Sequence, residues 1–174
     1  YQVCTRCVMD TTAKDIVFDE NGVCNYCTTF LNRLESSWAK VADLQARHKE
    51  FIAKVKSSGR GKEYDCIIGV SGGVDSSYVL YLAVNQGLHP LAVHLDNGWN
   101  TELASNNISN LVNHLGVDLY TYTIDWEEYR DLQLSFFKAN VVDIELLMDN
   151  AMIALNFQQA AKYKLKYILS GGNM

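Results

Sequence analysis

The sequence predicts an α/β fold, a doubly wound parallel sheet with a small N-terminal zinc ribbon and a linking helix. Three observations predict it. Apolar segments of strand length alternate with segments of helical periodicity from residue 64 onward. A glycine-rich turn directly follows the first of these strands, and four of the five cysteines fall within residues 1–27. The chain therefore divides into a cysteine-rich module and an α/β domain.

The composition is that of a globular protein. Hydrophobic residues make up 48% of the 174 residues and charged residues 20%, with a single proline. No apolar run approaches the roughly 18 residues of a membrane span, and no secretory signal is visible, so we expect a cytoplasmic protein. Residues 1–63 carry 10 Lys and Arg against 8 Asp and Glu, whereas residues 64–174 carry 5 against 12. An acidic main body disfavours a broad nucleic-acid footprint.

The cysteines follow the pattern of a zinc site with two CxxC turns. Cys4 and Cys7 are separated by two residues, as are Cys24 and Cys27, with 16 residues between the pairs. Asp19–Gly22 predicts a hairpin turn between them. Two disulfides or four free thiols are the alternatives, and the first is disfavoured without a secretory signal. Four thiolates leave no open position for water, so the predicted Zn²⁺ is structural.

A helix is expected next, from Thr28 to about Val55, with apolar residues at three- and four-residue steps. The segment Ser57–Gly61 (SSGRG) is typical of a linker. We therefore expect three parts, namely a Cys4 zinc ribbon at 1–27, a connecting helix and linker at 28–63, and an ATP-binding domain at 64–174.

Alternating elements fill the predicted domain. We expect strands at Tyr64–Val70, Pro90–Asp96, Leu119–Ile124 and Tyr167–Ser170, and helices at Val74–Gln86, Thr101–Leu115, Trp126–Lys138 and Ile144–Tyr163. Strands separated by helices pair in parallel, and ligands of such sheets bind beyond the carboxyl ends of the strands.

The motif at that edge is Ser71-Gly72-Gly73-Val74-Asp75-Ser76-Ser77. Glycines let the backbone turn tightly with its N–H groups pointing inward, and the helix that follows adds its positive end. The serine hydroxyls add donors. The motif therefore predicts an anion cradle of pyrophosphate size, in which Asp75 binds Mg²⁺ beside a triphosphate.

Other interpretations compete for this loop. The Gly-Lys-[Ser/Thr] ending of a Walker A loop and a full Gly-x-Gly-x-x-Gly are both absent. Gly69–Gly73 satisfies Gly-x-Ser-x-Gly, the nucleophile elbow of serine hydrolases, for which Asp96 and His114 are the available acid and histidine. A purely structural glycine turn also stays open.

The loop resembles the signature of the PP-loop ATP pyrophosphatases, which have the adenine nucleotide alpha-hydrolase-like fold. That resemblance implies a grip on the β,γ-phosphates of ATP while a substrate oxygen attacks the α-phosphate. Further segments resemble the N-acetyl sugar amidotransferases of bacterial lipopolysaccharide and surface-glycan synthesis. They are 4–11 (CTRCVMDT), 18–27 (FDENGVCNYC), 94–100 (HLDNGWN) and 170–174 (SGGNM).

The narrower resemblance implies an ATP-dependent amidotransferase. It would adenylylate the acetamido oxygen of a nucleotide-activated N-acetyl sugar, and ammonia would then give an acetamidino sugar. No cysteine is placed to act in a glutaminase, since four belong to the zinc pattern and Cys66 lies in a strand. A separate glutaminase subunit is the expected partner, and the family resemblance implies the same.

The expected cofactors are therefore ATP, Mg²⁺ and structural Zn²⁺. The predicted catalytic residues are Asp75, Ser71 and Ser76. The predicted nucleotide-binding residues are Gly69, Val70, Ser71, Gly72, Gly73, Asp75, Ser76, Ser77, His94, Asp96, Gly171 and Asn173. The predicted metal ligands are Cys4, Cys7, Cys24 and Cys27.

Some of these assignments have ordinary structural alternatives. Asp96 ends a strand and can contact ribose or Mg²⁺, or merely cap a turn. Asp143 and Asp149 are candidate sugar contacts, but acids near a helix N-terminus commonly complement the helix dipole.

The rival functions are a tRNA-thiolating PP-loop sulfurtransferase, a serine hydrolase and a zinc-ribbon binding module without catalysis. No cysteine follows Cys66, which disfavours thiolation. The last expected strand lies close to residue 174, and the resemblance implies a further sugar-binding portion. We therefore expect the ATP-binding domain to be C-terminally incomplete.

Overall fold

The computed structural model describes residues 1–38 and 44–172. The chain separates into two compact units, Tyr1–His48 and Lys49–Met174, and each is described by itself. The three-part division expected from the sequence stays a prediction.

The first unit is a short antiparallel turn structure followed by a helix. Val3 pairs with Asp10 and Phe18 with Cys24 in isolated antiparallel bridges. The hairpin turn ends at Gly22, whose φ of 75° suits glycine. Helix α1 (Asn25–Trp38) begins between the last two cluster cysteines. This unit therefore has little regular structure besides α1.

Helix α2 (Leu44–Gly59) extends past the predicted end at Val55. Residues 39–43, over which the expected helix was to continue, lie outside the described residues. Val55 is fully buried in the core of the second unit, and Ile52 packs beside it. The division between units accordingly falls at His48, before the segment Ser57–Gly61 that its composition predicts as a linker.

The second unit is built on a sheet of four parallel strands. They are β1 (Cys66–Gly69), β2 (Pro90–Asp96), β3 (Leu119–Thr123) and β4 (Ile168–Leu169). Their order is β3-β2-β1-β4, and every neighbouring pair is parallel. The chain moves outward from β1 to β3 and returns to the other side of β1. The strand order thus reverses between β1 and β4, which confirms the predicted fold class.

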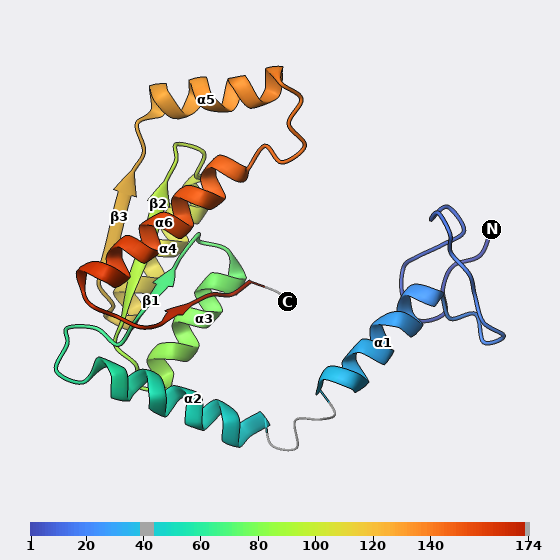
Figure 1. Cartoon of the computed structure of the whole chain (residues 1–174), viewed down its shortest axis with the longest axis horizontal. Coiled ribbons are helices and arrows are strands. Elements are labelled where there is room, and N and C mark those ends of the chain that lie inside the picture. The colour runs from blue at the N-terminus through green and yellow to red at the C-terminus, as the bar shows by residue number, and fades with distance from the viewer. Residues whose placement is uncertain (39–43, 173–174) are drawn as a thin grey trace. The chain divides into compact units, whose positions relative to one another are not determined.

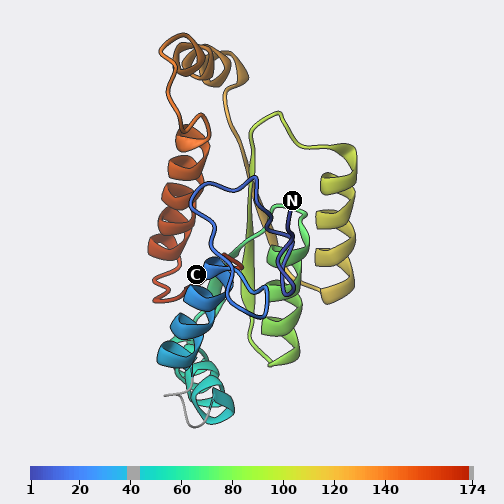
Figure 2. The same ribbon diagram turned by 90° about the vertical axis from the view of Figure 1, so that its right-hand side faces the viewer.

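Helices cover both faces of the sheet (Figures 1 and 2). Helices α3 (Val74–Asn85) and α4 (Glu102–Leu115) lie on one face, and α6 (Leu146–Lys162) lies on the other. The strands alternate accordingly, since Ile68 joins the core beneath α3 and α4 whereas Ile67 joins the core beneath α6. Each face of the sheet has its own apolar core.

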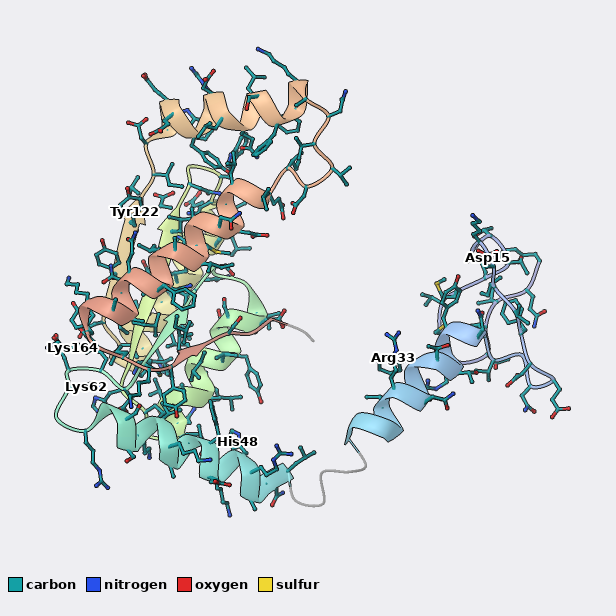
Figure 3. The ribbon with its side chains drawn as sticks, in the orientation of Figure 1. Asp15, Arg33, His48, Lys62, Tyr122 and Lys164 are labelled. Atoms are coloured by element: carbon teal, nitrogen blue, oxygen red, sulfur yellow. The ribbon has the colours of Figure 1, made fainter. Side chains whose placement is uncertain are left out.

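Helix α5 (Trp126–Lys138) connects β3 to α6 and stands beyond the end of the sheet (Figure 1). At the opposite end, Lys62 and Lys164 lie side by side (Figure 3), and the Lys62 ammonium donates to the Lys164 carbonyl at 2.7 Å. This contact joins the loop after α2 to the loop before β4. Within the described residues, no helix is long and apolar enough to cross a membrane.

Candidate functional site

The glycine loop, residues 71–77, lies between β1 and α3 at the point where the strand order reverses. Gly72 has a φ of 78°, and a Cβ there would lie 2.5 Å from the carbonyl oxygen of Ala104. Only glycine fits both the backbone conformation and the space. The loop therefore packs directly against the start of α4.

The helix that the loop opens has no side-chain cap. Gly73 is the N-cap residue of α3, whereas Thr101 caps α4 and Asp125 caps α5 by accepting a backbone N–H. The amides of the first turn of α3 are therefore open to an outside acceptor, and the helix dipole favours an anion there.

The loop serines hold the loop in shape. The Ser71 amide donates to Ser76 Oγ at 3.2 Å, and the two hydroxyl oxygens also lie 3.2 Å apart. The Gly73 amide lies 3.4 Å from Ser71 Oγ. Among the described residues no histidine hydrogen-bonds Ser71, and His114 lines a separate depression. The serine-hydrolase triad is therefore not assembled here.

A cavity of about 280 Å³ opens beside the loop. Its lining is Gly69, Val70, Ser71, Asp75, Ser76, Val93, His94, Leu95, Asn100, Met148, Met152, Leu155, Asn156, Ile168, Leu169, Ser170, Gly171 and Gly172. The residues come from the ends of β1, β2 and β4, from α6 and from the loop. No lysine or arginine is among these lining residues, so bound phosphates would rely on amides, hydroxyls and a cation.

Beneath the loop, a hydrogen-bond network fixes the end of β2. His94 is buried, and its Nδ1 lies 2.8 Å from the Val70 carbonyl oxygen, so that nitrogen is the donor. His94 Nε2 is then an acceptor, and Asn100 Nδ2 lies 3.0 Å from it and 3.1 Å from Asp96 Oδ1. Both neighbours accept, so the Asn100 amide has one orientation. The network connects the strand before the loop to Asp96.

The structure brings most of the predicted nucleotide-binding residues together. Seven line the cavity, namely Gly69, Val70, Ser71, Asp75, Ser76, His94 and Gly171. Gly72, Gly73 and Ser77 border the separate depression, and Asp96 reaches the cavity only through Asn100. A Cβ at Gly171 would lie 2.9 Å from the Asp75 carbonyl, so the segment after β4 packs on the start of α3. Asn173 lies outside the described residues.

The two candidate sugar contacts lie elsewhere. Asp143 is exposed and accepts the Glu145 amide at 3.2 Å, just before α6. Asp149 is exposed in the first turn of α6. Neither lines the cavity, and their substrate role stays a prediction.

Sequence reasoning missed Asn100 and the α6 wall. Met148, Met152, Leu155 and Asn156 are spaced four, three and one residues apart, which places them on one helix face. A polar residue on the apolar face of a predicted helix was the available signal for Asn156.

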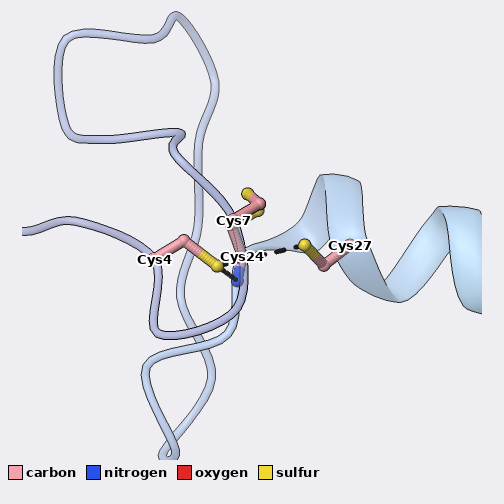
Figure 4. Close-up of side chains that lie close together, drawn as sticks. All are labelled: Cys4, Cys7, Cys24 and Cys27. Carbon is pink, nitrogen blue, oxygen red and sulfur yellow. Dashed lines mark hydrogen bonds between the residues drawn. The ribbon is translucent and has the colours of Figure 1, made fainter.

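The four cluster cysteines lie together in the first unit (Figure 4). Their sulfurs all lie within 4.8 Å of one another, with 4.0 Å between Cys4 and Cys27 and 3.7 Å between Cys7 and Cys24. A tetrahedral ion at a Zn–S distance of about 2.3 Å requires sulfurs about 3.8 Å apart. The cluster fits a tetrahedral S4 zinc site.

Backbone amides prepare one of these sulfurs for a metal. Burial acts to raise the pKa of Cys4, but the amides of Arg6, Cys24 and Cys7 lower it to about 6. Hydrogen bonding to Cys7, together with burial, raises the pKa of Cys27 to about 12. A metal that binds all four thiolates must therefore displace protons.

The fifth cysteine has a different environment. Cys66 is fully buried in β1, and burial raises the pKa of its thiol to about 12. It does not line the cavity, so it has the surroundings of an unreactive core thiol.

An open helix N-terminus, a glycine loop and a cavity at the reversal of strand order define the class of α/β proteins that bind phosphorylated ligands at this edge. The sequence narrows the class, because residues 44–172 match the family described as NAD synthase. The chain belongs to this family, within the PP-loop ATP pyrophosphatase superfamily.

Individual relatives agree on the fold. The glutamine-dependent NAD⁺ synthetase of Acinetobacter baumannii, solved with ADP, is 20% identical, with a TM-score of 0.56 over 72% of this chain and 23% of its own. The NH3-dependent NAD synthetase of Campylobacter jejuni is 18% identical, with a TM-score of 0.53 over 75% of this chain and 55% of its own.

A tRNA(Ile)-lysidine synthase of Chlamydia pneumoniae is 34% identical over 70 residues, which are 39% of this chain and 22% of that protein. The chain therefore spans between 22% and 55% of these relatives' lengths. The particular N-acetyl sugar amidotransferase resemblance is not among these findings.

Proposed function

We propose that the chain supplies the ATP-activating part of an amidotransferase that converts the acetamido group of a nucleotide-activated N-acetyl sugar into an acetamidine. The observation that carries the proposal is the uncapped N-terminus of α3 at the glycine loop, in a chain of the NAD synthase family. The two NAD synthetases named above are described as NH3-dependent and glutamine-dependent, which supports ammonia as the nucleophile.

The proposed chemistry has two steps. The acetamido oxygen attacks the α-phosphorus of ATP, the bond between the α-phosphorus and the bridging oxygen breaks, and pyrophosphate leaves. Ammonia then attacks the activated carbon, the C–O bond breaks, and AMP carries away the former amide oxygen. A proton from ammonia is lost, leaving the acetamidine. No covalent bond to the protein is needed.

The protein's contribution is position and charge. The open amides of α3 and the loop would hold the β,γ-phosphates, and Ser71 and Ser76 keep the loop in shape. Asp75 is exposed in the first turn of α3 and lines the cavity. Its carboxylate suits Mg²⁺, which would offset phosphate charge where the described lining offers no basic side chain.

The proposal includes two further components. The four cysteines hold a structural zinc ion, supported by the fit of their sulfur separations to a tetrahedron. A separate glutaminase subunit supplies the ammonia, supported by the absence of a cysteine from the cavity lining.

The test is exchange of labelled pyrophosphate into ATP, with UDP-linked acetamido sugars or tRNA as the added substrate. We expect stimulation by a sugar and, with ammonia present, a product in which NH replaces one oxygen. Stimulation by tRNA alone would overturn the sugar assignment.

Asp75→Asn should lower turnover by about 100-fold or more. Asp131→Asn, an exposed change on α5, is the matched control and should leave turnover unchanged.

A tRNA-modifying enzyme is the second candidate, favoured by the similarity to the tRNA(Ile)-lysidine synthase. Thiolation would need an accessible sulfur carrier, but Cys66 is fully buried. A non-catalytic zinc-ribbon module predicts no heat on titration with Mg·ATP, and a serine hydrolase predicts labelling of Ser71 by a fluorophosphonate. We expect neither result.

A further inference from the structure

The cavity has two chemically different walls. The glycine loop contributes Ser71, Asp75 and Ser76 on one side. On the other side, α6 contributes three apolar side chains and one carboxamide, that of Asn156. Phosphates require the open amides of the loop side, so the apolar side is left for the uncharged end of the nucleotide.

Asn156 differs from the other polar residues of this cavity. Its Oδ1 is buried and has no hydrogen-bond partner, which is true of no other side chain that lines the cavity in the described chain. His94 and Asn100 bond one another, and Ser71 and Ser76 bond one another. An acceptor left without a donor at the edge of a cavity indicates that a ligand supplies the donor.

The space around Asn156 favours a flat ligand group over a bulky one. Asn156 packs over the last residue of β1, Gly69, where a Cβ would lie only 3.2 Å from Asn156 Nδ2. Both residues line the cavity, as do Leu155 and Leu169 beside them. A carboxamide set among aliphatic side chains is the surrounding that proteins use to orient an aromatic base by one polar contact.

We propose that Asn156 selects the base of the bound nucleotide, with its Oδ1 accepting a hydrogen bond from the exocyclic amino group of adenine. This inference rests on the proposed function, in which ATP occupies the cavity. Adenine has an N6 amino donor next to a ring acceptor, which matches the acceptor and donor of one carboxamide. The amide must turn about its last torsion to face the base, a soft rotation for asparagine.

The same acceptor excludes other purines. A purine base without the amino group leaves Asn156 Oδ1 without its donor, and hypoxanthine has an oxygen at that position. A site built to bond an amino group discriminates because its buried polar atom stays unpaired with the wrong ligand.

The experiment measures binding of the magnesium complexes of ATP, purine riboside triphosphate and inosine triphosphate by calorimetry. The wild-type chain should prefer ATP over purine riboside triphosphate by about 10-fold. Asn156→Leu should bring that ratio close to one. Asn156→Asp keeps an acceptor and should keep the preference for the amino group. Gln158→Leu, an exposed change at a carboxamide on the same helix, should keep the wild-type ratio.

Each outcome has one meaning. A wild-type chain that binds no Mg·ATP overturns the proposed function itself. A wild-type chain that binds ATP and purine riboside triphosphate equally overturns only the role of Asn156. A ratio that Asn156→Leu leaves unchanged also overturns that role, and a raised KM for the sugar alone would assign Asn156 to the acetamido group instead. Thermal unfolding of each variant confirms that the compared chains are folded.

Discussion

The two units of this chain are held together by different interactions. In the first unit the buried cluster consists of three cysteines, Cys4, Cys24 and Cys27, with a few partly buried apolar residues beside them. In the second unit, apolar side chains fill a core on each face of a four-stranded sheet. Three thiols cannot supply the burial that stabilises an independent domain. The first unit thus depends on a metal, whereas the second depends on packing, and each can be broken separately.

Removal of the metal should have the largest effect. We expect a strong chelator to unfold residues 1–27 while the second unit keeps its structure, since structural zinc supplies on the order of 10 kcal/mol in such small modules. Titration with a thiol reagent measures this. No thiol should react quickly in the zinc-loaded chain, four of the five after chelation, and the buried Cys66 only in denaturant.

Rapid labelling of all four cluster cysteines without a chelator would show that no metal holds them. Cys24→Ser should reproduce the effect of the chelator, and the metal content of the purified chain provides the control.

The opposite break is made in the sheet. Ile68 is fully buried beneath α3 and α4, so Ile68→Ala leaves a cavity and should lower the free energy of unfolding of the second unit by about 2–5 kcal/mol. Zinc content should not change. Leu132→Ala, at a half-exposed position on α5, is the control and should cost much less. Loss of zinc from Ile68→Ala would show that the two units do not fold independently.

The sequence predicts these two units unequally well. The bounds of β2 and α5 agree with the expected segments, Pro90–Asp96 and Trp126–Lys138, because a proline and an aspartate N-cap mark where each begins. The division of the chain differs from the predicted linker, because Val55 is buried by contacts with residues distant in sequence. Local signals place elements, and packing decides which elements share a core.

The same reasoning applies to the cavity. The glycine loop is visible in sequence because its glycines and serines are neighbours along the chain. The roles of Asn100 and Asn156 depend on partners from other elements, Asn100 on His94 across six residues and Asn156 on Gly69 across the sheet. Asparagine is common on surfaces, so neither position is distinctive until the fold brings its partners together.

A smaller effect tests the network beneath the loop. Asn100→Ala removes the donor to His94 Nε2 and one donor to Asp96, and should destabilise the second unit by about 1–3 kcal/mol. Nitrogen-15 NMR of the wild-type chain should find His94 protonated on Nδ1, as the Val70 carbonyl requires. The Nε2-protonated tautomer in the wild type would contradict the network. The metal-held unit should be unaffected.

The smallest effect comes from the second orphaned acceptor in the described chain. Gln159 is 5% exposed on α6, and its Oε1 is buried without a partner, but it does not line the cavity. Gln159→Leu exchanges an unpaired acceptor for an apolar group of similar size, so it should stabilise the second unit by about 1 kcal/mol and leave the preference for ATP unchanged. Thermal unfolding and the purine-triphosphate titrations measure both. Asn156→Leu should also be tolerated by the fold but abolish the preference, because only Asn156 borders the cavity. A Gln159→Leu variant that lost base selectivity would show that the preference depends on the packing of α6 as a whole rather than on a single carboxamide.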